Sequence, residues 1–215
     1  DRNNLLKTQF PLHMPDLANP RSHFGLIQSV AACLDNDAIV ATDVGQHQMW
    51  VAQAYPLRRP RQWLTSGGLG TMGFGVPAAI GAALAEPKRT VVCFTGDGSI
   101  MMNIQELVTA AEENVNLKIV LMDNASLGLV HQQQTLFYGE RLFASQFKAS
   151  PDFIKIAQGF GIAAVDLDLA ANPCAALMEA ISRRGPCLIH ASIDVEQKVY
   201  PMVPPGAANH EMIGN

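Results

Sequence analysis

Short apolar runs alternate along this chain with longer stretches of helical pattern. Apolar runs of about four to eight residues, rich in β-branched side chains, are typical of buried strands. Six strands are expected on this basis, at residues 38–42, 62–65, 90–94, 118–122, 163–167 and 187–193. Helices are expected between them, at residues 22–34, 46–55, 74–85, 103–114, 151–159 and 172–183.

This alternation of strands and helices predicts an α/β fold. We expect a doubly wound, mainly parallel six-stranded sheet with helices on both faces. Right-handed crossovers then place the carboxyl ends of the strands at one edge, where ligands bind in open sheets. The folded domain is expected at 21–195, with a linker at 1–20 and an irregular tail at 196–215, because both flanking segments are rich in proline.

The composition fits one globular domain and argues against two kinds of partner. With 48% hydrophobic and 16% charged residues among 215, most of the chain can enter a single core. A formal net charge of -4 argues against nucleic acid. The longest nearly apolar run, 74–85, is far shorter than the roughly 20 residues of a spanning helix, so no membrane partner is expected.

The four cysteines, Cys33, Cys93, Cys174 and Cys187, lie far apart and show no C-x-x-C spacing. Neither a zinc site nor a disulfide framework is therefore indicated. The first residues lack the apolar core of a secretory signal. These features predict a reducing, cytoplasmic type of location. A bacterial source is expected, and an organellar form stays open.

Two loops at the expected binding edge carry oxygen ligands. The loop after the third strand contains Gly96, Asp97, Gly98 and Ser99, and the loop after the fourth contains Asn124. Mg²⁺ prefers about six oxygens and takes them from carboxylates, phosphates and water. The pair Asp97 and Asn124 therefore predicts a magnesium ion that bridges a diphosphate to the protein. We expect Gly96 and Gly98 to let the backbone turn sharply toward a phosphate, with Ser99 donating a hydrogen bond.

Other interpretations of the same residues remain open. Gly-Asp-Gly is a common turn, and Asp97 could simply cap the next helix. The glycine-rich stretch 66–75 contains a formal G-x-G-x-x-G from Gly68 to Gly73, which can mark a dinucleotide site with Asp97 on a ribose hydroxyl. Against this, the strand expected at 62–65 is short and polar for the central strand of a dinucleotide fold. The glycines could instead let a flat ring rest against the backbone.

Together these motifs resemble the C-terminal, thiamine-diphosphate-binding domain (PP-type) of biosynthetic acetolactate (acetohydroxyacid) synthases. The resemblance covers nearly the whole chain. It is carried by segments 45–50, 64–73, 96–99 with Asn124, 127–130 and 200–207. The metal motif alone is common to the wider cofactor superfamily, which includes enzymes of the pyruvate oxidase and glyoxylate carboligase types. Gln46-His47-Gln48 and the tail resemble the synthase branch in particular.

The resemblance implies a magnesium site and contacts to a diphosphate. The metal would be held by the Asp97 carboxylate, the Asn124 side-chain oxygen and the backbone carbonyl of Ser126. Gln46 and His47 match residues that contact the diphosphate in the family. These roles are implied by the matching positions and predict thiamine diphosphate and Mg²⁺ as cofactors.

The resemblance also implies contacts to the rings of the cofactor and to substrate. Gly70 and Met72 match positions whose backbone binds the aminopyrimidine, and the Met72 side chain would support the bent cofactor. Met72 and Gln133 are the candidates on the substrate side. The residues expected to touch the cofactor are Gly45, Gln46, His47, Gln48, Gly70, Met72, Gly96, Asp97, Gly98, Ser99, Asn124, Ser126, Leu127, Gly128 and Leu129.

The activity implied is decarboxylation of pyruvate and joining of the two-carbon unit to a second 2-keto acid, in branched-chain amino acid biosynthesis. The family works as a homodimer of catalytic subunits, with a regulatory small subunit and with FAD mostly on a middle domain. Its catalytic glutamate lies on an N-terminal domain that nothing in this sequence matches. Glu106, Glu112 and Glu113 are better interpreted as a solvated helix face. We therefore expect this chain alone to be inactive.

Two positions depart from the family pattern. Asp123 stands where the first asparagine of an Asn-Asn pair is usual, whereas Asn124 is kept. Gln133 stands where most members have a tryptophan that favours 2-ketobutyrate as second substrate. Because an amide lacks the flat apolar wall of an indole, weak discrimination between pyruvate and 2-ketobutyrate is expected.

Segments 126–148 and 196–215 are expected to behave as lids, because they order over the active site in the family. The alternative is an ordinary loop and a frayed terminus. Three classes of function remain: a thiamine-diphosphate carboligase domain, a nicotinamide-dependent oxidoreductase, and a catalytically silent α/β module used for assembly. Dependence of ligand binding on magnesium separates the first two.

Overall fold

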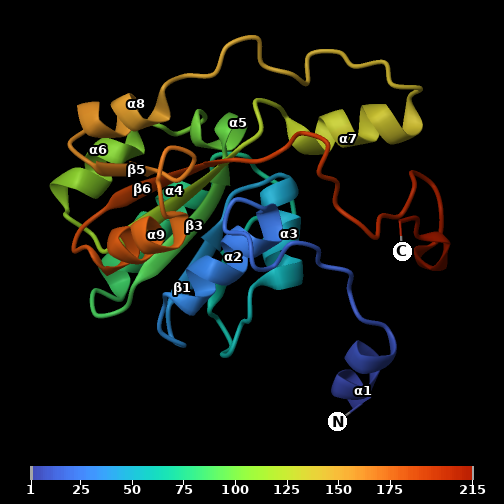
Figure 1. The fold of residues 1–215 in the computed structure, drawn as a ribbon, viewed down its shortest axis with the longest axis horizontal. Helices are drawn as coiled ribbons and strands as arrows, with labels where there is room; N and C mark the ends of the chain where they lie inside the picture. Colours follow the sequence, from blue (N-terminus) through green and yellow to red (C-terminus); the bar gives the residue numbers. More distant parts are fainter. Residues whose placement is uncertain (1, 215) are drawn as a thin grey trace.

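The computed structural model describes residues 2–214, apart from the side chains of residues 3, 4 and 7. Its centre is a six-stranded sheet in which every described pairing is parallel, in the order β2-β1-β3-β4-β6-β5 (Figure 1). The strands are β1 (Ile39–Thr42), β2 (Trp63–Thr65), β3 (Val91–Gly96), β4 (Leu117–Asp123), β5 (Ala163–Asp166) and β6 (Cys187–Ser192). The predicted doubly wound parallel sheet is confirmed.

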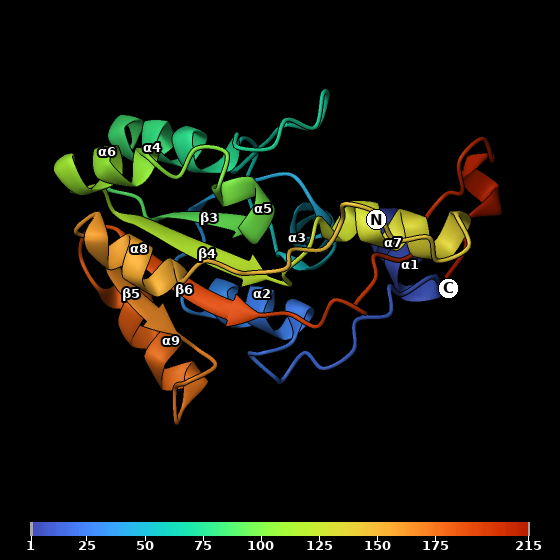
Figure 2. The same cartoon turned by 90° about the horizontal axis from the view of Figure 1, so that it is seen from above.

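Helices cover both faces of this sheet, as Figure 2 shows in a view across the layers. One hydrophobic core joins the sheet to α2 (His23–Ala32), α3 (Gln46–Ala54) and α9 (Pro173–Ser182). The other joins it to α4 (Gly75–Ala85), α6 (Glu106–Glu112) and α8 (Phe153–Gly159). Side-chain caps fix several helix starts: Ser22 accepts the Gly25 N–H, and Asn172 accepts that of Ala175.

The central strands supply both cores because their side chains alternate between the two faces. Val92 and Phe94 of β3 pack into the first core, and Val91 and Cys93 into the second. All four are fully buried. Near-continuous apolar strands of this kind are typical of parallel sheets covered on both sides. Because every described strand pair is parallel, the carboxyl ends of the strands emerge at one edge of the sheet.

The carboxyl edge carries two helices that were not expected from the sequence. The predicted loop 95–99 is in fact the end of β3 followed at once by a helical turn, α5 (Asp97–Ile100). A longer helix, α7 (Gly128–Phe137), lies inside the expected lid 126–148. In Figure 2 the strand arrows point toward α5, α3 and α7.

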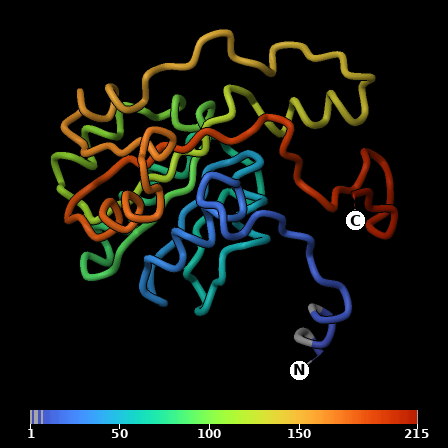
Figure 3. The backbone as a smooth tube through the Cα atoms, viewed as in Figure 1, coloured from blue at the N-terminus to red at the C-terminus, as the bar shows by residue number. Residues whose placement is uncertain are grey.

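The two ends of the chain extend from the sheet domain. The expected linker 1–20 contains a helix, α1 (Arg2–Gln9), which stands away from the sheet (Figure 1). The tail leaves β6, passes α7 and ends near a short 3₁₀ helix, η1 (Asn209–Glu211), as the tube in Figure 3 traces. Within residues 2–214, no helix is both long and apolar enough to cross a membrane.

Candidate functional site

A cavity of about 200 Å³ opens at the carboxyl edge of the sheet, beside the ends of β1, β3 and β4. Every residue expected to touch the cofactor lines it except Gln48, whose amide donates to Thr65 Oγ1 at 2.8 Å. Gln133, expected on the substrate side, lines it as well. Residues from distant parts of the sequence therefore meet at the edge where the topology predicted a site.

Asp97 and Asn124 both line this cavity because their strands are neighbours in the sheet. Gly96 at the end of β3 pairs with Met122 near the end of β4, so the turns that follow lie side by side. Asp97 is 4% exposed, and its Oδ2 accepts the Ser126 N–H at 3.0 Å. The expected convergence of the two turns is thus present, and a direct hydrogen bond ties them together.

Electrostatics at Asp97 favour a bound cation. Burial, followed by the nearby charge of Asp123, raises the pKa of Asp97 to about 7. Two carboxyl groups in contact at a buried site repel each other when both are ionised. A divalent ion at the Asp97 carboxylate would remove this repulsion and restore the charged form.

The second turn presents Asn124 and Ser126 in different ways. Asn124 Nδ2 donates to Gln46 Oε1 at 3.1 Å, so Oδ1 is the atom left to bind a cation. The Ser126 hydroxyl donates to the Ser145 carbonyl at 2.5 Å, and its N–H is used by Asp97. Ala125 between them adopts a left-handed conformation, φ 51°. This strained turn is the local feature that holds Ser126 toward Asp97.

The glycines of the first motif provide space rather than a sharp turn, which corrects the expectation from the sequence. Gly96 has an ordinary φ of -109°, and Gly98 lies within α5. A Cβ on Gly96 would stand 3.0 Å from His47 Nδ1, and one on Gly98 only 2.8 Å from Leu127 Cδ2. A larger residue at either position would therefore press against His47 or Leu127, which line the cavity.

Ser99 also differs from its expected role. Its hydroxyl donates to the Val44 carbonyl at 2.7 Å, so in this structure it ties α5 to the loop after β1. The side chain is 2% exposed and fully committed to that bond. Its contribution to a phosphate would have to come from the backbone.

His47 offers a buried polar atom to the cavity. The side chain is 6% exposed, and its Nε2 has no hydrogen-bond partner among the described residues. Burial lowers the pKa of His47 to about 4, only partly opposed by a hydrogen bond to the Asp43 backbone, so the ring is neutral. An adjacent anion would raise this pKa, and the protonated ring could then donate to a phosphate oxygen. An unsatisfied buried nitrogen facing a cavity fits a ligand group.

Asp43, which was not predicted, fixes the glycine-rich stretch. It is fully buried, and its Oδ1 accepts the Gly73 N–H at 2.8 Å and the Val44 N–H at 3.0 Å. Asn103 donates to the Gly73 carbonyl at 2.7 Å. These bonds hold the segment that brings Gly70 and Met72 to the cavity. An acid directly after β1, at the binding edge, was the sequence signal for Asp43.

The dinucleotide interpretation of this stretch does not fit the sheet. The strand before the glycines, β2, is a three-residue edge strand, whereas the dinucleotide fingerprint follows a central strand. Asp97 accepts the Ser126 N–H and lines the same cavity as Asn124. The loop after β4 is therefore part of the same site. The dinucleotide interpretation gives this loop no role.

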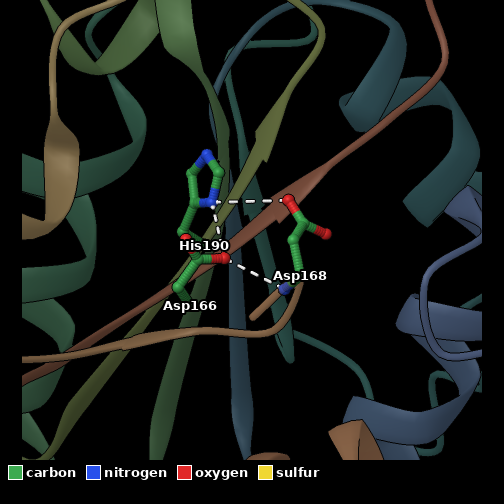
Figure 4. A group of neighbouring side chains, drawn as sticks. All are labelled: Asp166, Asp168 and His190. Carbon is green, nitrogen blue, oxygen red and sulfur yellow. Dashed lines mark hydrogen bonds and ion pairs between the residues drawn. The ribbon is translucent and has the colours of Figure 1, made fainter. Parts of the chain in front are cut away.

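A second polar cluster lies at the ends of β5 and β6, where Figure 4 shows Asp166, Asp168 and His190 facing one another. His190 Nδ1 lies 3.3 Å from Asp166 and 3.8 Å from Asp168, and Nε2 lies 3.2 Å from Asp123 Oδ2. Asp166 also accepts the Asp168 N–H, and Asp168 that of Ser192. These groups satisfy one another, so the cluster is interpreted as an ion-paired network.

The charge of Asp123 is balanced through this network. Burial acts to lower the pKa of His190, but hydrogen bonds and charge from Asp123 and Asp166 outweigh it and the pKa is raised. Burial likewise acts to raise the pKa of Asp123, and His190 with the Ala125 N–H reverses that effect and lowers it. The unusual acid before Asn124 is therefore held ionised, with His190 as its counter-ion.

A six-stranded parallel sheet with a cavity lined by Asp97, Asn124 and glycines at its carboxyl edge is typical of cofactor-binding domains. The model of the thiamine pyrophosphate enzyme family, C-terminal TPP binding domain, matches residues 43–191. The chain belongs to this family.

The similar proteins narrow the class further. The chain is 63% identical over 209 residues to the acetolactate synthase isozyme 1 large subunit of Escherichia coli K12, covering 97% of this chain and 37% of the relative. It is 51% identical over 177 residues to the isozyme 2 large subunit of the same organism, covering 82% and 32%. It is 47% identical over 190 residues to the acetolactate synthase large subunit of Lactococcus lactis, covering 87% and 32%. The chain thus spans about a third of the length of these relatives.

Proposed function

We propose that this chain is the cofactor-binding part of an acetolactate synthase large subunit. The complete enzyme would decarboxylate pyruvate on thiamine diphosphate and join the two-carbon unit to a second 2-keto acid. The observation that carries this proposal is that Asp97 and Asn124 line the same cavity, with the Ser126 N–H donating to Asp97. Similarity to acetolactate synthase large subunits over most of the chain supports it.

In this proposal the residues of the two turns hold Mg²⁺. The Asp97 carboxylate, Asn124 Oδ1 and the Ser126 carbonyl supply hard oxygens, and diphosphate oxygens and water would complete the shell. Gln46 and His47 line the cavity and would contact the diphosphate. The cation would also neutralise the buried carboxylate of Asp97.

The opposite wall of the cavity would hold the rings and the acceptor substrate. Gly70 and Met72 line it, held there through Asp43 and Gly73. Their backbone groups would bind the aminopyrimidine, and the Met72 side chain would support the bent shape. When bound, thiamine diphosphate supplies the carbon that attacks the ketone of pyruvate. Gln133 of α7, exposed at the mouth of the cavity, would face the acceptor.

We further propose the partners of the complete enzyme. An N-terminal domain would provide the glutamate that protonates the pyrimidine, in a homodimer of catalytic subunits, and a middle domain would hold FAD. The relatives are called large subunits, which supports a small subunit as partner. Four free cysteines, three of them wholly or partly buried, and bacterial relatives support a cytoplasmic location.

Calorimetric titration of the full-length polypeptide that carries this chain tests the function. Thiamine diphosphate should bind tightly with Mg²⁺ and at least about tenfold more weakly after its removal by a chelator. NAD⁺ should not bind under either condition. Tight NAD⁺ binding without dependence on Mg²⁺ would instead support the oxidoreductase, and binding of neither ligand would support an assembly module.

A further inference from the structure

A continuous series of hydrogen bonds joins the cavity to the C-terminal tail. Asn124 Nδ2 donates to Gln46 Oε1 at 3.1 Å, and Gln46 Nε2 donates to Gln132 Oε1 at 2.9 Å. Gln132 of α7 pairs with the Val199 backbone in both directions, donating to its carbonyl at 2.9 Å and accepting its N–H at 2.8 Å. Gln46 also donates to the Gln197 carbonyl at 2.9 Å. We call these side chains and the two tail residues the amide relay.

The inner members of the amide relay, Gln46, Gln132 and Val199, are buried, so their bonds must be satisfied within the protein, whereas Asn124 and Gln197 at its ends are half-buried. Gln46 is 3% exposed, Gln132 is 1% exposed and Val199 is fully buried. A buried amide left without a partner costs about 1–3 kcal/mol. Solvent therefore cannot satisfy Gln46 or Gln132 when one of their hydrogen bonds is broken. A change at Val199 is thus transmitted to the bond between Gln46 and Asn124.

The tail backbone decides which atom of Asn124 faces away from the relay. The Val199 N–H can only donate and its carbonyl can only accept, which fixes the orientation of the Gln132 amide. Gln132 then presents Oε1 to Gln46, so Gln46 must offer Nε2 in that direction and Oε1 toward Asn124. Asn124 must then donate from Nδ2 to Gln46 Oε1. Its oxygen is left for the cavity.

We propose that Gln132 is a positioning residue for the cation, acting on Asn124 through Gln46 and held in orientation by Val199. This inference rests on the proposed function of Asn124 as a metal ligand. It assigns a role to a buried glutamine that does not touch the metal, and it explains why an amide lies on the inner face of α7. Groups that orient a metal ligand typically change metal affinity about 10–100-fold when removed.

The same connection makes the tail and the cation mutually dependent. If an ordered tail favours cation binding through the relay, cation binding must favour an ordered tail by the same factor. Protection of the Val199 N–H from hydrogen exchange should therefore increase when Mg²⁺ and thiamine diphosphate are added. Ligand binding by itself stabilises the whole domain, so the increase at Val199 has to exceed that at core amides such as Val92.

The test uses the full-length polypeptide that carries this chain, with saturating thiamine diphosphate and a calorimetric titration of Mg²⁺. Gln132→Met keeps the volume but removes both hydrogen bonds to Val199. Gln62→Met is the matched control, because Gln62 is 2% exposed and bonds only backbone groups at the opposite edge of the sheet, including the Ala38 carbonyl. Two shortened chains form a second pair: one ends at Glu196 and lacks the relay partners, and one ends at Met202 and keeps them.

Gln132→Met and the chain ending at Glu196 should bind Mg²⁺ at least about tenfold more weakly, and Gln132→Met should also lose any effect of Mg²⁺ on protection of the Val199 N–H. Gln62→Met and the chain ending at Met202 should match the wild type. If Gln132→Met does not fold, the Mg²⁺ affinities of the chains ending at Glu196 and at Met202 test the inference. Wild-type affinity in folded Gln132→Met, or equal affinity in the two shortened chains, overturns the inference alone. A wild type that binds no Mg²⁺ with thiamine diphosphate overturns the proposed function as well.

Discussion

At the scale of residues, the site is organised by buried charges that compensate one another. Asp97 lines the cavity and its pKa is raised by burial, whereas Asp123, at the end of the neighbouring strand, is paired with His190. The two acids therefore differ in what neutralises them. This difference explains how a carboxylate can replace the usual amide at position 123 while Asn124 keeps its place at the cavity.

The pair of His190 and Asp123 should make stability depend on pH in a defined window. The raised pKa of His190 adds stability below its ordinary value of 6.5, and this is lost as pH rises through the folded pKa. The lowered pKa of Asp123 adds stability above its ordinary 3.8, lost as pH falls through the folded value. Both contributions are present between these limits.

His190→Asn should therefore destabilise the protein more at pH 6 than at pH 9. Urea unfolding of wild type and variant at the two pH values measures this difference. His210→Asn, at an exposed histidine of the tail, serves as the control and should show no such dependence. Equal destabilisation by His190→Asn at both pH values would show that the ion pair does not form.

The residue at 133 should set the choice of acceptor in the complete enzyme. Gln133 is exposed at the cavity wall and offers no flat apolar surface. Gln133→Trp should raise the preference for 2-ketobutyrate over pyruvate by about tenfold, since one methylene in an apolar pocket is worth about 10–200-fold. Competition between the two acceptors measures the product ratio. A strong preference for 2-ketobutyrate in the wild type would refute the account of Gln133.

At the scale of elements, a glycine at the start of one helix and a glycine in the interior of another have opposite roles. A Cβ on Gly128, at the start of α7, would meet Gln46 Oε1 at 2.1 Å and Asn124 Nδ2 at 2.6 Å. A Cβ on Gly81, within α4, would meet nothing within 4 Å. The first glycine makes room for a side-chain contact at the site, and the second only weakens its helix.

Gly128→Ala should destabilise the protein by about 1–3 kcal/mol, because the added methyl group has to displace the contact of Gln46 with Asn124. Gly81→Ala should stabilise it by about 0.5–1 kcal/mol through helix propensity. Chemical denaturation of both variants provides the comparison. A Gly128→Ala variant as stable as Gly81→Ala would mean that the two side chains are not packed as described.

The elements also show how far the sequence alone could lead. Apolar runs identified the buried strands, and their spacing identified the helices on both faces, since double burial leaves a strong pattern; the half-buried edge strand β2 left a weaker one. α5 was missed because Gly-Asp-Gly favours turns when read locally, whereas here the chain closes a helical turn directly on the strand. α7 was missed because segment 126–148 was interpreted as a lid from the family resemblance, and because the inner face of α7 buries the polar side chain of Gln132.

For the site, the sequence supplied the cavity lining but not the network behind it. Asp97 and Asn124 were found because they follow neighbouring strands of the sheet. Gln132 and His190 were not found, since a buried amide or imidazole is recognised only from its partners, Val199 and Asp123, which are distant in sequence. Contacts of this kind arise from tertiary structure and leave no local pattern.

At the scale of the whole molecule, the chain forms one wall of a site that is open to solvent. The described residues that line the cavity would, in the proposed function, hold the metal, the diphosphate and the rings of the cofactor. Among the apolar side chains, Leu69, next to the lining residue Gly70, is 94% exposed. An enzyme that excludes water from its reaction would need further protein over this opening.

We therefore expect the 215-residue chain by itself to form no acetolactate from pyruvate, and to bind thiamine diphosphate weakly. Joined to the N-terminal domains of its full-length polypeptide, the same chain should bind the cofactor and form product. A colorimetric assay of acetolactate in the two samples makes the comparison. Product formed by the isolated chain would show that the glutamate of another domain is not required.

The central claim is that Asp97 and Asn124 hold a divalent cation beneath a diphosphate. Crystals of the full-length polypeptide with Mn²⁺ and thiamine diphosphate would locate the ion by its anomalous scattering. The account predicts one peak coordinated by the Asp97 carboxylate, Asn124 Oδ1 and the Ser126 carbonyl. A peak at Asp166, Asp168 and His190 instead, or a diphosphate bound without any ion at Asp97, would contradict it.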